Sequence, residues 1–241
     1  MTMTHTKPSH ITRSIATQNG FFDQHSSDDR QPVFYATAVS LYCAKVRIML
    51  RHKQIDWREK QPDGGYGSLT WRQQVPAGNL PALKHNNVVL TDSEVIAEYL
   101  EEIWPETAMQ AKAPVLRALV RQRGRFHDTR LEPALRVFFG WLGKRSDRPE
   151  PSAFDQLQQR LDQCGQLLDL EQHQLSASYL WLGDCGFAAS FPWIDIVEQK
   201  ADHSLNWPDQ VLGLRHHLES FQAVKDEYAA YIPAINHWME T

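Results

Sequence analysis

The chain has 241 residues, which suits one large domain or two small ones, and 42% of them are hydrophobic, as in a folded globular protein. The formal net charge of −4 gives no electrostatic basis for binding nucleic acid or an anionic membrane. No apolar run approaches the roughly 18 residues of a transmembrane helix. Three cysteines without CxxC spacing, and eleven histidines without an HExxH or His-x-His pattern, predict a reduced, cytoplasmic protein with no disulfide framework and no metal site.

Residues 1–31 differ in composition from the rest of the chain. They are rich in Ser, Thr, His and Asp, and their one short apolar stretch is Phe21-Phe22. They lack the continuous apolar core of a secretory signal. We therefore expect a flexible N-terminal arm over residues 1–31. The absence of acidic residues before Asp23 leaves an organelle-targeting segment as an open alternative.

Residues 33–104 alternate between strand and helix signals. Strands are expected at residues 33–36, 55–60, 82–85 and 88–90, helices at 41–53 and 94–103, and an irregular or short helical connection at 66–75. Asn86-Asn87 separates the last two strands, and asparagine tolerates the positive φ of a tight hairpin. This order predicts a mixed sheet covered by helices, that is, an α/β domain over residues 32–110.

Leu80-Pro81 lies directly before the expected hairpin. Proline cannot donate to a strand ladder, so it belongs at an edge or in a special turn and is often cis there. A cis bond would turn the Leu80 peptide outward, where it can pair with an extended peptide ligand. Thr91 to Glu94 matches a capping box that opens a helix, and a helix N-terminus favours an anion. These two features together predict a site for a small peptide.

The chain after Trp104-Pro105 is predicted to be nearly all helical. One long helix begins near Pro114 and bends or ends near Pro133, and an amphipathic helix follows over residues 154–168. Shorter helices are expected at 188–199, 209–220 and 222–231, and no strand-like alternation follows residue 112. The pattern predicts an all-helical domain over residues 111–241. Its tryptophans, Trp141, Trp193, Trp207 and Trp238, are interpreted as core residues.

Three segments, in order, carry a resemblance to a known family. Residues 35–48 end in Lys45-Val46-Arg47-Ile48, residues 76–83 are similar to an NPxGKVPAL motif, and residues 90–100 are similar to LTESxAIxxYL. The chain therefore resembles the cytosolic glutathione transferase superfamily from residue 33 to about residue 231. The resemblance implies a thioredoxin-like N-terminal domain joined to an all-α C-terminal domain, glutathione as co-substrate, and a homodimer.

The resemblance also implies which residues bind glutathione. Leu80 matches the residue whose backbone pairs with the cysteinyl unit, and Pro81 matches the cis proline. Asp92 and Ser93 match the acid and hydroxyl pair that holds the γ-glutamyl ammonium and carboxylate. Asn79 stands where many members place a Lys or Gln near the glycine carboxylate, so the cation for that carboxylate is unassigned, with Arg72 as a guess.

Ser40 falls where serine-type members place the hydroxyl that hydrogen-bonds the glutathione sulfur. A free thiol has a pKa of about 8.5, and a hydroxyl donor together with a helix N-terminus lowers it. One charge-assisted hydrogen bond is worth about 1.5–3 kcal/mol, enough for a shift of one to two pKa units. Two other readings stay open: Ser40 as a helix N-cap only, and Cys43, in the same first turn, as a thiol nucleophile or as a buried small hydrophobe.

The electrophile pocket is expected between the two domains. The residues predicted to line it are Thr37 and Val39 in the loop before the first helix, and Arg117, Arg121 and Phe126 in the first long helix. The leading hypothesis is a detoxification enzyme that conjugates glutathione to an electrophilic, largely apolar small molecule. The alternatives are a thiol–disulfide oxidoreductase or reductive dehalogenase that uses Cys43, and a non-catalytic binding protein on the same fold.

The sequence departs from the family pattern in the C-terminal half. Members usually carry Gly-Asp followed by Thr-x-Ala-Asp, an N-capping box of the core helix. Gly183-Asp184 is present here, but Ser190 stands where the later acid would be. The start and length of this helix are therefore expected to differ.

Overall fold

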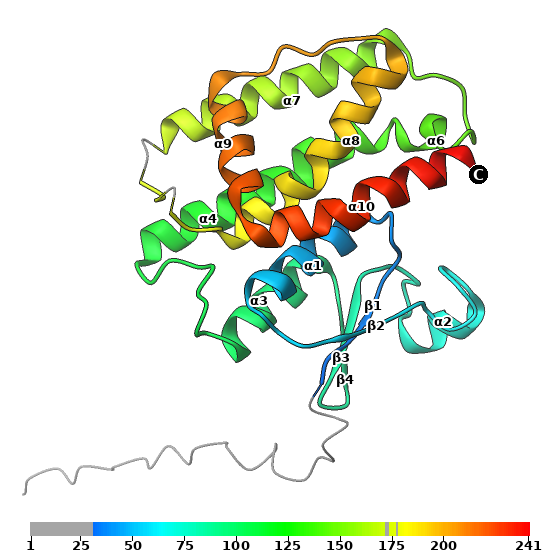
Figure 1. Cartoon of the computed structure of the whole chain (residues 1–241), viewed down its shortest axis with the longest axis vertical. Helices are drawn as coiled ribbons and strands as arrows, with labels where there is room; N and C mark the ends of the chain where they lie inside the picture. The colour runs from blue at the N-terminus through cyan, green and yellow to red at the C-terminus, as the bar shows by residue number, and fades with distance from the viewer. Residues whose placement is uncertain (1–30, 172–173, 177) are drawn as a thin grey trace, which may run out of the picture.

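The computed structural model describes residues 31–171, 174–176 and 178–241. The arm expected at residues 1–31 therefore lies outside the described residues, apart from Gln31. The described chain forms a sheet with three helices, followed by a purely helical half (Figure 1). The expected combination of a thioredoxin-like α/β unit and an all-α unit is confirmed.

The sheet has four strands in the order β2-β1-β3-β4. They are β1 (Val33–Tyr35), β2 (Arg58–Lys60), β3 (Ala82–His85) and β4 (Val88–Thr91). Strand β1 pairs parallel with β2 and antiparallel with β3, so the sheet is mixed, as predicted. Asn86 and Asn87 form the turn between β3 and β4 with φ values of 48° and 63°, which confirms the predicted hairpin.

Three helices belong to the sheet unit: α1 (Leu41–His52), α2 (Leu69–Gln74) and α3 (Ser93–Ile103). Helix α1 begins after Ser40, whose Oγ accepts a hydrogen bond from the main-chain N of Cys43. Helix α3 begins one residue later than the predicted capping box implied, because Asp92, rather than Thr91, is its N-cap. Thr91 instead ends β4 and pairs with Ala82.

The helical half differs from the prediction mainly in its first long helix. Its elements are α4 (Pro114–Phe126), a π-helical turn (His127–Leu131), α5 (Glu132–Arg136), α6 (Phe139–Leu142), α7 (Pro151–Leu170), a 3₁₀ turn (Leu182–Asp184), α8 (Cys185–Ala201), α9 (Asp209–Ser220) and α10 (Gln222–Glu240). The helical path continues through Pro133 because this residue lies in the first turn of α5, where a missing N–H costs little. Helix α8 begins directly after Asp184, and α10 extends to Glu240 with Pro233 inside it.

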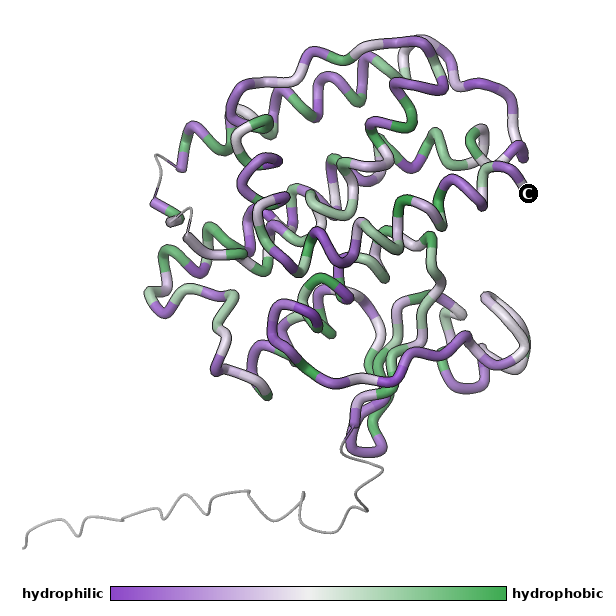
Figure 2. The backbone as a smooth tube through the Cα atoms, in the orientation of Figure 1, coloured by the Kyte–Doolittle hydropathy of each residue, from purple (hydrophilic) through white to green (hydrophobic). Residues whose placement is uncertain are grey.

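One apolar core joins the two halves. Helix α1 buries nine of its twelve residues and packs against α8 and α10 of the helical half. Figure 2 shows hydrophobic residues along the central strands and alternating hydrophilic and hydrophobic stretches along the helices. Within the described part of the chain, no helix has both the length and the hydropathy needed to cross a membrane.

Candidate functional site

The peptide bond between Leu80 and Pro81 is cis, as predicted. It lies just before β3, and the indole Nε1 of Trp71 donates to the carbonyl oxygen of Asn79 at 3.2 Å. Among the described residues, none forms a main-chain hydrogen bond with Leu80. The N–H and C=O of Leu80 are therefore available to a ligand that runs alongside this segment before β3.

The N-terminus of α3 lies beside Leu80-Pro81. Asp92 has a φ of 75°, and its Oδ1 accepts hydrogen bonds from the main-chain N atoms of Glu94 at 2.8 Å and Val95 at 3.3 Å. Ser93 is buried. A hollow of about 270 Å³ opens here, lined by Tyr42, Asn79, Leu80, Pro81, Asp92, Ser93, Arg125, Asp128 and Thr129. The structure thus brings together all five residues predicted to bind glutathione.

A larger hollow, of about 660 Å³, adjoins the first. Its lining residues are Thr37, Val39, Ser40, Leu41, Tyr42, Tyr66, Asn79, Leu80, Arg136, Phe139, Arg145, Trp193 and Trp238. The two hollows share Tyr42, Asn79 and Leu80, so they form one continuous depression. Ser40 and the α3 N-terminus lie in its two parts, and a ligand along Leu80 would contact both parts.

Ser40 and Cys43 occupy the same turn but differ in access. Because the Ser40 Oγ accepts from Cys43 N at 3.3 Å, its own hydrogen remains free to turn toward an acceptor in the hollow. Cys43 is fully buried, and burial raises the pKa of its thiol despite the opposing effects of the Ser40 hydroxyl and Arg47. A buried, protonated thiol is a poor nucleophile.

Tyr42 is a third candidate for the residue that acts on a bound sulfur, because its side chain lines both hollows. Burial raises the pKa of its phenol, and the nearby carboxylates of Glu132 and Asp128 raise it further. The phenol therefore stays protonated, but its hydroxyl already interacts with Glu132. Ser40 is the better placed donor for a bound sulfur.

Arg47 holds the loop that precedes Ser40. Its Nη2 donates to the carbonyl oxygen of Ala38 at 3.1 Å, and its Nε donates to Oε1 of Glu227 at 2.7 Å. Glu227 lies on α10 and is 1% exposed. The loop is thereby tied to the helical half as well as to α1.

Four residues considered in the sequence analysis lie elsewhere. Arg117 and Arg121 line a separate hollow between α3 and α4, where Arg121 pairs with Glu98 at 2.8 Å. Phe126 stacks on the ring of Phe187, with ring centroids 6.5 Å apart. The Nε of Arg72 donates to the carbonyl oxygen of Gly67. The structure does not bring these side chains to Ser40. Helix α4 ends at Phe126, and α5 and α6, which follow the π-helical turn, supply Arg136 and Phe139 to the larger hollow instead.

Eight residues that line the larger hollow were missed by sequence reasoning. They are Leu41, Tyr42, Tyr66, Arg136, Phe139, Arg145, Trp193 and Trp238. Trp193 and Trp238 were interpreted as core, and Trp193 is indeed almost fully buried, yet both line the hollow. Leu41 and Tyr42 carried a sequence signal, since they lie one and two residues after Ser40.

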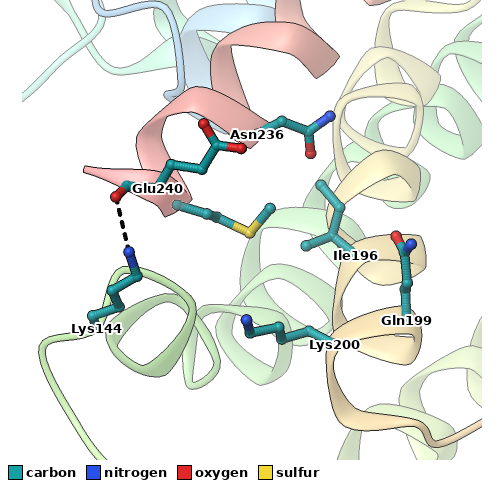
Figure 3. A pocket seen from close by; sticks show the side chains of 7 residues that line it. Lys144, Ile196, Gln199, Lys200, Asn236 and Glu240 are labelled. Carbon is teal, nitrogen blue, oxygen red and sulfur yellow. Dashed lines mark hydrogen bonds between the residues drawn. The ribbon is translucent and has the colours of Figure 1, made fainter.

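Another hollow, of about 570 Å³, lies between α8, α10 and the segment after α6 (Figure 3). Lys144 Nζ donates there to the main-chain oxygen of Glu240 at 2.9 Å. None of the predicted site residues lines it. Within the described residues, no three His, Cys, Asp or Glu side chains gather as metal ligands would.

Comparisons with known proteins match the N-terminal part of this chain to glutathione transferases. Residues 34–108 match the family model of the glutathione S-transferase N-terminal domain. Glutathione S-transferase 1 of Dianthus caryophyllus is 30% identical over 45% of this chain and 50% of its own length. The stringent starvation protein A homolog of Pasteurella multocida is 31% identical over 36% of this chain and 41% of its own length. The chain thus spans at most half the length of these curated relatives.

Solved structures of glutathione transferases share the fold. A Bombyx mori glutathione transferase superposes with a TM-score of 0.73 at 14% identity, covering 88% of this chain and 97% of that one. A glutathione S-transferase from Methylobacillus flagellatus, solved with glutathione bound, gives a TM-score of 0.66 at 19% identity, covering 82% of this chain and 98% of that one. These likenesses extend the agreement from the N-terminal domain to the helical half.

Proposed function

Because this chain belongs to the glutathione transferase superfamily through its N-terminal domain, we propose that it conjugates glutathione to an electrophilic small molecule with a largely apolar body. The observation that carries the proposal is the continuous depression that has Ser40 in one part and Asp92-Ser93 in the other, with Leu80 shared between them. In this proposal the division into domains at residues 32–110 and 111–241 separates glutathione binding from most of the acceptor-binding wall.

The proposed chemistry begins with the thiol of glutathione. The main chain of Leu80 pairs with the cysteinyl unit, and Asp92 with Ser93 holds the γ-glutamyl ammonium and carboxylate. The Ser40 hydroxyl donates a hydrogen bond to the sulfur, and the N-terminus of α1 adds its positive end. A pKa lowered by one or two units converts most of the bound thiol to thiolate near neutral pH. The thiolate then forms the S–C bond to the electrophile.

The proposal includes a two-fold homodimer. It is supported by the family resemblance and by exposed apolar side chains on three neighbouring elements: Val88 on β4, Val95 on α3 and Val115 on α4. Size-exclusion chromatography with light scattering should give a mass near twice the 27.8 kDa of one chain. A monomer at micromolar concentration contradicts this part of the proposal.

A cytoplasmic role in detoxification is also proposed. It is supported by the three cysteines, Cys43, Cys164 and Cys185, which are all free and buried, as expected in a reducing compartment.

The experiment that tests the catalytic assignment compares three variants with the parent protein. Ser40→Ala, Cys43→Ser and Tyr42→Phe are assayed for conjugation of glutathione to 1-chloro-2,4-dinitrobenzene as a function of pH. The Ser40→Ala change should lower kcat/KM at neutral pH by about tenfold to a hundredfold and raise the thiol pKa by about one to two units. Cys43→Ser and Tyr42→Phe should leave that pKa unchanged.

Each contrary result favours a different alternative. Activity that survives Ser40→Ala and is lost in Cys43→Ser assigns the chemistry to Cys43, as in an oxidoreductase or dehalogenase. Glutathione binding without turnover of any electrophile favours the non-catalytic binding protein. Folded parent protein that passes unretained through a glutathione column removes the basis of the whole proposal.

A further inference from the structure

The larger hollow has an aromatic wall on its helical side. Phe139 of α6 and Trp193 of α8 have ring centroids 4.4 Å apart, and Trp193 meets Trp238 of α10 edge to face at 5.6 Å. Trp193 is fixed in this wall because its Nε1 donates to the hydroxyl of Tyr231 at 2.6 Å. Phe139 and Trp238 are partly exposed and are backed by the buried Trp193, and all three line the same hollow as Ser40, so the wall suits the flat body of an aryl or conjugated molecule.

Two arginines flank this wall and differ in their partners. Arg136 lies over the rings of Tyr42 and Phe139, and it forms an ion pair with the buried carboxylate of Glu132. Arg145 lies over the ring of Trp238, 5.2 Å from its centroid. In the part of the chain that the structure describes, no carboxylate or hydrogen-bond acceptor contacts the Arg145 guanidinium.

The charge balance of the hollow follows from this difference. Of the described residues that line it, none is Asp or Glu. Glu132 neutralises Arg136, so Arg145 supplies one uncompensated positive charge beside an aromatic wall. A planar guanidinium of this kind favours a carboxylate, which it binds through two parallel hydrogen bonds.

From this arrangement we propose that the acceptor is a flat electrophile with one carboxylate, and that Arg145 binds this carboxylate while the aromatic wall holds the ring. The inference rests on the proposed conjugation function and specifies its substrate class. For a chloroaryl carboxylate, the thiolate sulfur forms a bond to the ring carbon, the C–Cl bond breaks, and chloride leaves with the bonding pair. Arg145 takes no part in bond making; it determines which acceptor binds.

The test uses two acceptors with the same leaving group, 4-chloro-3-nitrobenzoate and its methyl ester. The Arg145→Gln variant should lose about tenfold to a hundredfold in kcat/KM for the acid, and much less for the ester, with the KM for glutathione unchanged. Arg148→Gln is the matched control, because Arg148 also lies over aromatic rings, those of Trp141 and Phe154, but lines a different hollow. It should leave the ratio of acid to ester unchanged.

Binding measured without turnover separates this inference from the proposed function. Quenching of tryptophan fluorescence by each nitroaryl acceptor gives its Kd in the parent protein and in Arg145→Gln. Acid binding that weakens in Arg145→Gln, in a protein without conjugating activity, supports the carboxylate site and rejects the function. Equal losses for acid and ester, no loss for either, or a rise in the KM for glutathione with both acceptors would overturn the inference. The last result would assign Arg145 to the glycine carboxylate of glutathione.

Discussion

The ammonium of Lys45 on α1 lies 2.7 Å from Oε2 of Glu94 on α3, and the Lys45 side chain is fully buried. Burial alone would lower the pKa of this ammonium, but the carboxylates of Asp128 and Glu94 raise it above the ordinary value for lysine. Asp128 accepts from the same Nζ at 2.9 Å, so one cation joins the sheet unit to the helical half. Glu94 directly follows Ser93 in the chain, and Ser93 and Asp128 both line the smaller hollow of the candidate site.

Replacing Lys45 with Met should destabilise the protein strongly. The substitution leaves two poorly exposed carboxylates, Glu94 and Asp128, without their shared cation, which costs about 3–5 kcal/mol in the free energy of unfolding. Urea denaturation at neutral pH measures the loss. The control is Lys84→Met at an exposed position of β3, expected to change stability by about 0.5 kcal/mol or less. Equal effects from the two substitutions would show that the buried cation is not a structural tie.

Asp128 should make stability depend on acid pH. Burial raises the pKa of its carboxyl, but hydrogen bonds from His127 and the charge of Lys45 outweigh burial and lower the pKa to about 2. Because this pKa lies below the value of 3.8 for an unperturbed Asp, the stabilisation is complete above pH 4 and is lost as pH falls from about 4 to 2. The difference in unfolding free energy between the parent and Asp128→Asn should therefore shrink by about 1 kcal/mol between pH 6 and pH 3. A difference that stays constant or grows contradicts the lowered pKa.

Glu227→Gln should affect both stability and catalysis. The buried Glu227 carboxylate accepts from Arg47 at 2.7 Å and from Arg51 at 3.2 Å, so its loss should cost about 3 kcal/mol. Since Arg47 also holds the Ala38 carbonyl, the conjugation kcat should fall as well. Glu59→Gln removes the more exposed partner of Arg47 and should cost about 1 kcal/mol or less. Thermal unfolding and steady-state assays compare the two variants. A larger loss from Glu59→Gln than from Glu227→Gln would show that Glu227 is not the main partner of Arg47.

Gly183→Ala should be among the most damaging small substitutions. A Cβ at Gly183 would lie 2.0 Å from the main-chain oxygen of Val120 on α4, a contact that only a backbone shift relieves. We expect a loss of about 3 kcal/mol or failure to fold. Gly213→Ala in α9 is the matched control, because nothing lies within 4 Å of its added methyl group, and it should stabilise the protein by about 0.5–1 kcal/mol. Chemical denaturation of the two variants tests this, and a neutral Gly183→Ala would disprove the close approach.

The sequence predicted the local features of the site because these depend on neighbouring residues. The cis Leu80-Pro81 bond, the Asn86-Asn87 turn and the role of Ser40 as a helix cap all follow from residue type and position. The predicted position of the α3 N-cap was wrong by one residue, because Thr91 pairs with Ala82 in the sheet and Asp92 caps the helix.

The acceptor side of the depression was not predictable in the same way. Arg145 and Trp238 meet across 93 positions of sequence, the difference between 238 and 145, and their contact depends on how α10 packs beside the segment after α6. Arg117 and Arg121, chosen from one amphipathic helix, lie elsewhere because helix periodicity does not specify which neighbour a face will meet. For the same reason, the sequence did not predict the hydrogen bond between the Ser190 hydroxyl and Nε2 of buried His127, whose atoms lie 2.7 Å apart. Ser190 was noted only as a departure from the family pattern.

The two sides of the depression come from different stretches of the chain. Ser40, Leu80 and Asp92 belong to the sheet unit, whereas Phe139, Trp193 and Trp238 belong to the helices that follow it. Under the proposed function, mutations in those helices would therefore change which acceptor is preferred and leave thiol activation intact. Acceptor preference and thiol activation would in this sense be separable traits, free to diverge at different rates among descendants of one ancestral gene.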